Sequence, residues 1–159
     1  MPEPGSGGVQ TLLAFDVGAR RIGVAVGNTV SMSAGEVGVL DVHAAGPDWP
    51  ALDRWVREWR PARMVVGDPA TLDGGDQPIR RRARDFAAEL QRRYALPVEQ
   101  VDERTSSIEA AQRFAAGRAA GSRKRKGAAS LDATAAVVIL ERWLREPQSR
   151  IALPPEPEA

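Results

Sequence analysis

Residues 12–26 read LLAFDVGARRIGVAV, and this stretch decides the fold because it contains two apolar runs joined by the short turn GARR. Residues 12–17 are apolar on both faces apart from Asp16, which is typical of a central strand that is covered on both sides. Residues 22–26 are equally apolar, so the two runs predict a β-hairpin. Asp16 and Gly18 lie at the end of the first strand, which is where α/β folds usually bind ligands.

The rest of the chain extends this sheet and covers it with helices. The expected strands after the hairpin are residues 36–42, 63–67 and 98–101. The expected helices are residues 52–59, residues 78–94, one that opens with the capping box of Ser106 and Glu109, and one over residues 130–144. Three antiparallel strands followed by alternating helices and strands predict an α/β fold, with a mixed five-stranded sheet and helices on both of its faces.

The composition indicates one folded domain between two flexible ends. Residues 1–10 and 147–159 are rich in glycine or proline and predict flexible termini, which leaves residues 11–146 as the domain. The start of the chain lacks the basic and apolar regions of a signal peptide, and no apolar stretch reaches the roughly 18 residues that span a bilayer. We therefore expect a cytoplasmic protein that makes no contact with a membrane.

Several common kinds of site are excluded by the residue types present. The chain has no cysteine and a single histidine, His43. Disulfides, thiol nucleophiles and the usual cysteine and histidine zinc sites are thereby ruled out, so any metal must bind to oxygen ligands. The sequence also lacks the phosphate-binding loop GxxxxGK[ST] and a GxGxxG fingerprint after a strand.

Three acidic residues are expected to meet at one edge of the sheet. Asp16 ends the first strand, Glu103 follows the strand at residues 98–101, and Asp132 lies in the first turn of the last expected helix. Carboxylates brought together repel one another unless a cation lies between them, and oxygen ligands alone suit Mg²⁺ or Mn²⁺. A pair of such ions is the usual means of hydrolysing a phosphodiester. The sequence therefore predicts a two-metal nuclease with Asp16, Glu103 and Asp132 as catalytic residues and metal ligands.

Each of these acids also has a simpler structural explanation. Asp16 could be a turn residue that bonds to its own backbone. Asp132 could interact favourably with the dipole at the start of its helix, which Ser130 would cap. Asp102 and Glu103 are adjacent and face opposite ways if the strand continues, so only one of them reaches a shared site. The longer side chain of Glu103 is the first choice, and Asp102 is the reserve.

Basic residues are concentrated in the second half of the chain. Residues 113–126, RFAAGRAAGSRKRK, carry six positive charges and no acid. Such clusters bind nucleic acid by displacing the counterions on its phosphates, although a lone basic run is often only a solvated loop. The arginine face of the helix at residues 78–94 is expected to add to this surface. The predicted nucleic-acid contacts are Arg20, Arg21, Arg104, Arg123, Lys124, Arg125 and Lys126.

Five segments carry a resemblance to a known family. They are FDVGARRIGVAV (15–26), VVGDPATLDGG (65–75), FAAEL (86–90), VDERTSSIEA (101–110) and LDATAAVVILERWL (131–144). In this order and spacing they resemble the YqgF family, also called RuvX, of RuvC-like proteins with the ribonuclease H-like fold. The resemblance implies a nuclease that matures the 5′ end of pre-16S ribosomal RNA. The family's first-strand aspartate matches Asp16, its D-E-R acid matches Glu103, and its last-helix aspartate matches Asp132.

Two positions depart from the family pattern. The family usually has V-V-G-L-P where this chain has Asp68 before Pro69, so Asp68 is an additional acid, either an outer metal contact or a harmless exposed residue. Where the family often has Ser-Asp after the second strand, this chain has Gly27 and Asn28.

The sequence leaves the substrate and the degree of catalysis open. The expected partner is nucleic acid, either pre-ribosomal RNA or the branched DNA of a Holliday junction, and the protein could also bind a pre-ribosomal particle. One alternative is a ribosome assembly factor with weak catalysis. Another is an ATP-hydrolysing protein of the same fold, but 159 residues do not supply the second domain that it needs. The oligomeric state is not predicted.

Overall fold

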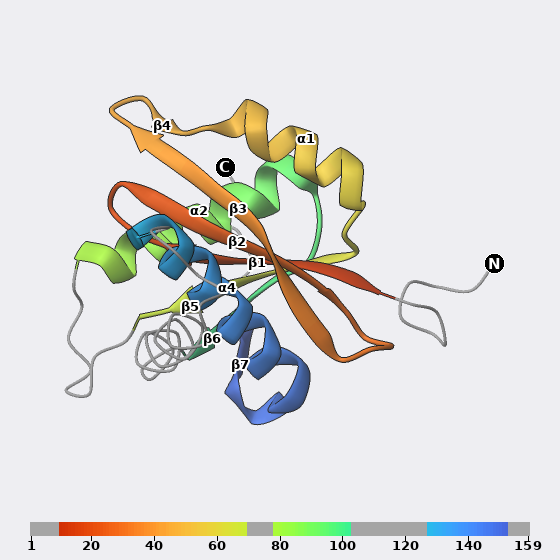
Figure 1. Ribbon diagram of the computed structural model, residues 1–159. Coiled ribbons are helices and arrows are strands. Elements are labelled where there is room, and N and C mark those ends of the chain that lie inside the picture. Colours follow the sequence, from red (N-terminus) through yellow and green to blue (C-terminus); the bar gives the residue numbers. More distant parts are fainter. Residues whose placement is uncertain (1–9, 70–77, 103–126, 153–159) are drawn as a thin grey trace.

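The computed structural model describes residues 10–69, 78–102 and 127–152. Its seven-stranded mixed sheet has the strand order β4-β3-β2-β1-β5-β6-β7, with helices on both faces (Figure 1). In chain order the elements are β1 (Thr11–Val17), β2 (Arg21–Asn28), β3 (Ser33–His43), β4 (Gly46–Pro47), α1 (Trp49–Trp59), β5 (Arg63–Asp68), α2 (Pro78–Tyr94), β6 (Val98–Asp102), α4 (Gly127–Arg145), a 3-10 turn (Pro147–Ser149) and β7 (Arg150–Ala152). The predicted α/β fold with a mixed sheet is confirmed. The helix expected at Ser106 lies outside the described residues.

The strand directions bring three strand ends to one edge of the sheet. β1, β2 and β3 are antiparallel neighbours, as the hairpin pattern predicted. β5 runs parallel to β1, and β6 runs parallel to β5. The carboxyl ends of β1, β5 and β6 therefore point the same way, and their residues can contribute to one site.

Two short strands were missing from the predicted sheet. β4 has two residues and β7 has three, too few to give a readable alternation, so the expected number of five strands was too low. β7 pairs with β6 and lies in the segment that was expected to be a flexible tail. Arg150, the first residue of β7, attaches this segment to α4. Its guanidinium lies 3.7 Å from the ring centre of Trp143, and its Nε donates to the Trp143 carbonyl oxygen at 2.9 Å.

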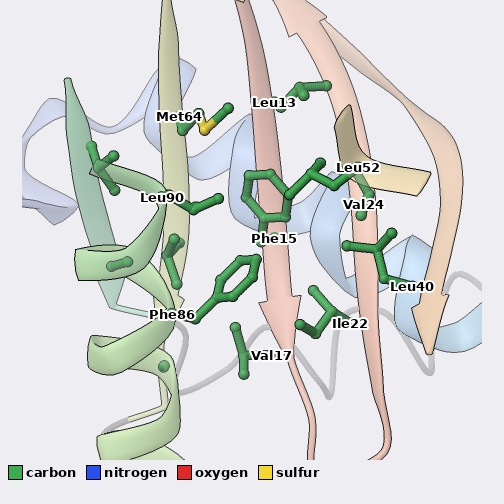
Figure 2. Close-up of a cluster of buried hydrophobic side chains, with 14 of the residues drawn as sticks. Leu13, Phe15, Val17, Ile22, Val24, Leu40, Leu52, Met64, Phe86 and Leu90 are labelled. Atoms are coloured by element: carbon green, nitrogen blue, oxygen red, sulfur yellow. The ribbon is translucent and has the colours of Figure 1, made fainter. Parts of the chain in front are cut away.

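One face of the sheet is covered by α1 and α2. Figure 2 shows the side chains of Leu13, Phe15 and Val17 on this face of β1, in a buried cluster with residues of the neighbouring strands and of both helices. Phe86 of α2 meets the ring of Phe15 edge-on at 5.2 Å and stacks on Trp49 of α1 at 5.7 Å. Such aromatic pairs add to the apolar burial that holds the helices on the sheet.

The other face is covered by α4, which carries a nearly continuous buried run from Ala133 to Leu140. Leu12 and Ala14, the alternate residues of β1, pack against Ile139 and Leu140 on this side. The helix begins at Gly127, one turn before the predicted start, because the alanines at 128 and 129 favour helix and nothing there ends it. Asp132 is therefore in the second turn of α4 and not in its first. No helix within the described ranges is long and apolar enough to cross a membrane.

Candidate functional site

Asp16 lies on the face of the sheet that α4 covers. Side chains alternate along a strand, so Asp16 continues the side of Leu12 and Ala14 and not that of Phe15. It is partly buried near the carboxyl end of β1. Its direct neighbour across the antiparallel pair is Gly23 of β2.

Gly23 is where α4 crosses the sheet. A Cβ atom built on Gly23 would lie 2.0 Å from the carbonyl oxygen of Asp132 and 2.9 Å from the backbone nitrogen of Ala133. Only glycine permits this approach, and the helix backbone rests directly on the strand. Cross-strand neighbours in an antiparallel pair share a face, so Asp16 and Asp132 lie on the same side of the sheet around Gly23. Two of the three predicted metal ligands thus share one face of the sheet.

Arg21 is also on this face, and it pairs with Asp132. The Arg21 Nε donates to Asp132 Oδ2 at 2.8 Å, and the two side chains are 40% and 28% exposed. The sequence predicted Arg21 as a nucleic-acid contact, and the structure gives it an acidic partner that is 111 residues away in the chain. Arg20 is exposed in the turn between β1 and β2.

Asp68 lies on the opposite face of the sheet. It is only 5% exposed, and its two carboxylate oxygens accept from Nε and Nη2 of Arg80 at 2.9 and 3.2 Å. The expectation of a harmless exposed residue was therefore wrong, and its face does not suit an outer metal contact beside Asp16. Asp102 is the register partner of Asp68 on β6, and so it lies on the same face as Asp68.

The third predicted acid lies beyond the described residues. Glu103 follows directly after the last residue of β6. On that strand Glu99 and Val101 face α4, and Glu99 accepts a hydrogen bond from Nε1 of Trp143 at 2.9 Å. Also outside the described ranges are Arg104, Arg123, Lys124, Arg125 and Lys126. Among the residues that the structure does describe, no group of three or more histidine, cysteine, aspartate or glutamate side chains could hold a metal ion.

The arginines of α2 do not face Asp16, because α2 covers the other side of the sheet. Arg93 pairs with Asp53 of α1 at 3.3 Å, and Arg92 pairs with Glu89 at 2.6 Å within the helix. The Arg80 and Arg93 pairs therefore connect α2 to β5 and to α1, whereas the Arg92 pair stays within the helix. The expectation was that this face binds the nucleic-acid backbone together with the basic loop, and it stays a prediction because the loop lies outside the described residues.

A cavity lies at the same end of β1 but on the α2 side. Its volume is about 360 Å³, and its walls are mostly apolar, with Val17, Trp49 and Phe86 among them. Asp85 and Glu89 line it from α2. The cavity and the Asp16 carboxylate are thus on opposite faces of the sheet.

The sheet order and the helices on both faces define a RuvC-like α/β fold. A solved structure described as "T. thermophilus RuvC in complex with Holliday junction substrate" is similar over 90% of this chain and 99% of that one, with a TM-score of 0.54 and 14% sequence identity. At this identity the similarity shows the fold alone.

Sequence comparison then identifies the family. The family model described as "RuvX: Holliday junction resolvase" matches residues 10–146, and the chain belongs to this family. A relative from Xanthomonas campestris pv. campestris (strain B100), named "Putative pre-16S rRNA nuclease", is 61% identical over 144 residues, which cover 91% of this chain and 93% of the relative. A relative of the same name from Xanthomonas axonopodis pv. citri (strain 306) is 59% identical with the same coverage.

Proposed function

We propose that the protein is a metal-dependent nuclease that hydrolyses phosphodiester bonds in the maturation of the 5′ end of pre-16S ribosomal RNA. The observation that carries the proposal is the placement of Asp16 and Asp132 on one face of the sheet, around Gly23. The name of the Xanthomonas relatives supports the choice of substrate, because the identity extends over nearly the whole of both chains.

The acids on this face fit a hard divalent cation. Aspartate oxygens at the end of a strand are ligands that Mg²⁺ and Mn²⁺ take, and a chain without cysteine offers no competing thiolate. Asp16, Asp132 and Glu103 would hold the metal ions. Bound ions of this kind activate water and stabilise the leaving oxygen in phosphodiester hydrolysis.

The chain's own residues would position the substrate. Gly23 fixes the backbone of Asp132 against the sheet, so the two carboxylates are held by rigid elements and not by loops. Arg20, Arg104 and the basic residues 123–126 would bind backbone phosphates, which carry no sequence information. The shape of the RNA would then select the cleavage position.

Branched DNA is the second candidate substrate, because the matching family model is described as a Holliday junction resolvase. A third possibility is an assembly factor that binds the RNA but cleaves it weakly. The three differ in what they cut and in whether they cut at all, so one assay separates them.

The test is cleavage by the purified chain of a pre-16S RNA carrying its 5′ leader, alongside a four-way DNA junction. We expect RNA cleavage with Mg²⁺ or Mn²⁺, none with chelator, and binding without turnover in Ca²⁺, whose looser coordination does not suit in-line attack. Asp16→Asn and Asp132→Asn should each lower the rate at least about a hundredfold. Asp85→Asn, which removes an exposed carboxylate on α2, is the matched control. Full activity in chelator, or cleavage of the junction alone, would contradict the proposal.

A further inference from the structure

The pair between Arg21 and Asp132 is built into the crossing of α4 and β2. Arg21 and Gly23 are two residues apart on β2, so they share the face under α4. Gly23 holds the backbone of Asp132, and Arg21 reaches the carboxylate of the same residue with its Nε at 2.8 Å. The guanidinium therefore occupies one oxygen of a carboxylate that the proposed function assigns to a metal ion.

This contact can be exchanged. Arg21 is 40% exposed and Asp132 is 28% exposed, so water reaches both groups. Pairs that are this open change an equilibrium by only about two- to fivefold, which is far less than a buried pair would. A divalent cation carries twice the charge of the guanidinium and takes oxygen ligands in a fixed geometry, so it can replace Arg21 at Asp132.

We propose that Arg21 is an exchangeable counterion of Asp132. It neutralises this carboxylate beside Asp16 before metal binds, and it gives the carboxylate up when the cation arrives. The released guanidinium stays at the carboxyl end of the strands and binds a substrate phosphate, for which arginine is well suited. This inference rests on the proposed function and adds the order of events: Arg21 contacts RNA only after the metal has taken Asp132.

The alternative is that Arg21 stays bound to Asp132 when the metal binds and holds its carboxylate in place. If Arg21 only oriented Asp132 for the metal, removing it would weaken metal binding. If it is a competing counterion, removing it strengthens metal binding and leaves a site that holds RNA less well. The two roles thus predict changes of opposite sign in the same measurement.

The first measurement is the dissociation constant for Mn²⁺, taken at low ionic strength without RNA. We expect Arg21→Gln to bind Mn²⁺ about two- to fivefold more tightly than the unchanged protein. Arg21→Lys keeps a competing charge and should bind more like the unchanged protein. Arg20→Gln is the matched control, since it removes the same charge one residue away from an exposed position, and its Mn²⁺ affinity should change less than that of Arg21→Gln.

The second measurement is the affinity for the RNA, with chelator and with Ca²⁺. Arg21→Gln should bind RNA nearly as well as the unchanged protein in chelator, and at least about threefold more weakly in Ca²⁺, because only the metal frees the guanidinium. Thermal melts establish that each variant is folded.

The outcomes separate this inference from the proposed function. Unchanged or weaker Mn²⁺ binding in Arg21→Gln, with normal metal binding and cleavage by the unchanged protein, would overturn the counterion role alone. An equal loss of RNA affinity in chelator and in Ca²⁺ would do the same. If the unchanged protein bound no Mn²⁺, both proposals would fall.

Discussion

Gly23 lies where α4 crosses β2, and any larger side chain there would meet the helix backbone at Asp132. Backbone atoms cannot turn aside as a flexible side chain can, so Gly23→Ala must push α4 away from the sheet. Overpacking of this kind typically lowers the free energy of unfolding by about 1–3 kcal/mol. We expect a loss in that range by urea denaturation, together with weaker Mn²⁺ binding because Asp132 is displaced.

Gly35→Ala is the matched control for this prediction. A Cβ built on Gly35 meets no atom within 4 Å, and the residue is on the neighbouring strand β3. Its free energy of unfolding should stay within about 0.5 kcal/mol of the unchanged protein. Equal effects of the two substitutions would show that the close approach at Gly23 does not matter.

Asp68 gives a second prediction for a single residue. It is buried and holds Arg80 through two hydrogen bonds, so Asp68→Asn removes the charge that compensates the guanidinium. Losing one partner of such a pair should lower the free energy of unfolding by about 2–3 kcal/mol. Because Asp68 faces α2, Mn²⁺ binding at Asp16 should not change. A variant that kept its stability but lost metal affinity would place Asp68 in the site.

The residues of the site were predictable to different degrees. Asp16 and Asp132 stand out because each is a charge among apolar residues of known period. The close contact of Gly23 and the partner of Arg21 were not predictable, because both depend on a helix more than a hundred residues away in the chain. The exposure of Asp68 was predicted wrongly, because the sequence alone does not show on which face of the sheet an acid at the end of a strand lies.

At the scale of elements, α1 and α2 are joined by Asp53. Its carboxylate accepts from the hydroxyl of Tyr94 at 2.6 Å and from Arg93, and these two hydrogen bonds lower the pKa of Asp53. A lowered pKa in the folded state stabilises the protein above the ordinary aspartate pKa of about 3.9, and this stabilisation is lost as the pH falls through the folded value.

Tyr94→Phe tests this connection between the helices. It removes the hydrogen bond that lowers the pKa of Asp53 most, so this pKa should rise toward its ordinary value in a carboxyl NMR titration. The variant should lose stability at pH 6, and the loss should shrink as the pH falls through the folded-state pKa of Asp53. Arg92→Gln, in which the altered residue pairs with Glu89 instead, should leave the Asp53 pKa unchanged.

Long elements were predicted well, and short ones were not. The hairpin, α2 and the two parallel strands follow from alternation and helical periodicity. β4 and β7 are too short to show a period, and β7 depends on the stacking of Arg150 on Trp143 from another element. The start of α4 was placed late because Ser130 resembles a cap, although the alanines before it continue the helix.

At the scale of the whole molecule, the two faces of the mixed sheet carry different kinds of residues. The face under α1 and α2 carries the apolar cluster around Phe15 and Phe86 (Figure 2), with the Asp68–Arg80 pair on the same side. The face under α4 carries Asp16, Asp132 and Arg21. The overall fold could be predicted because three antiparallel strands followed by helix and strand units allow few arrangements. Which acids share a face depends on register, and register appears only in three dimensions.

The central claim is that Asp16 and Asp132 form one cation site, and thermal melts with and without Mn²⁺ test it most directly. Saturating Mn²⁺ should raise the melting temperature of the unchanged protein by roughly 5–10 °C. Asp16→Asn and Asp132→Asn should each abolish most of this rise, the double variant should lose no more, and Asp85→Asn should keep it. Without metal, Asp16→Asn should melt close to the unchanged protein, because Arg21 already neutralises Asp132 on the same face. A lower metal-free melting temperature for Asp16→Asn, combined with an undiminished response to Mn²⁺, would mean that Asp16 is only a structural residue and would contradict the account.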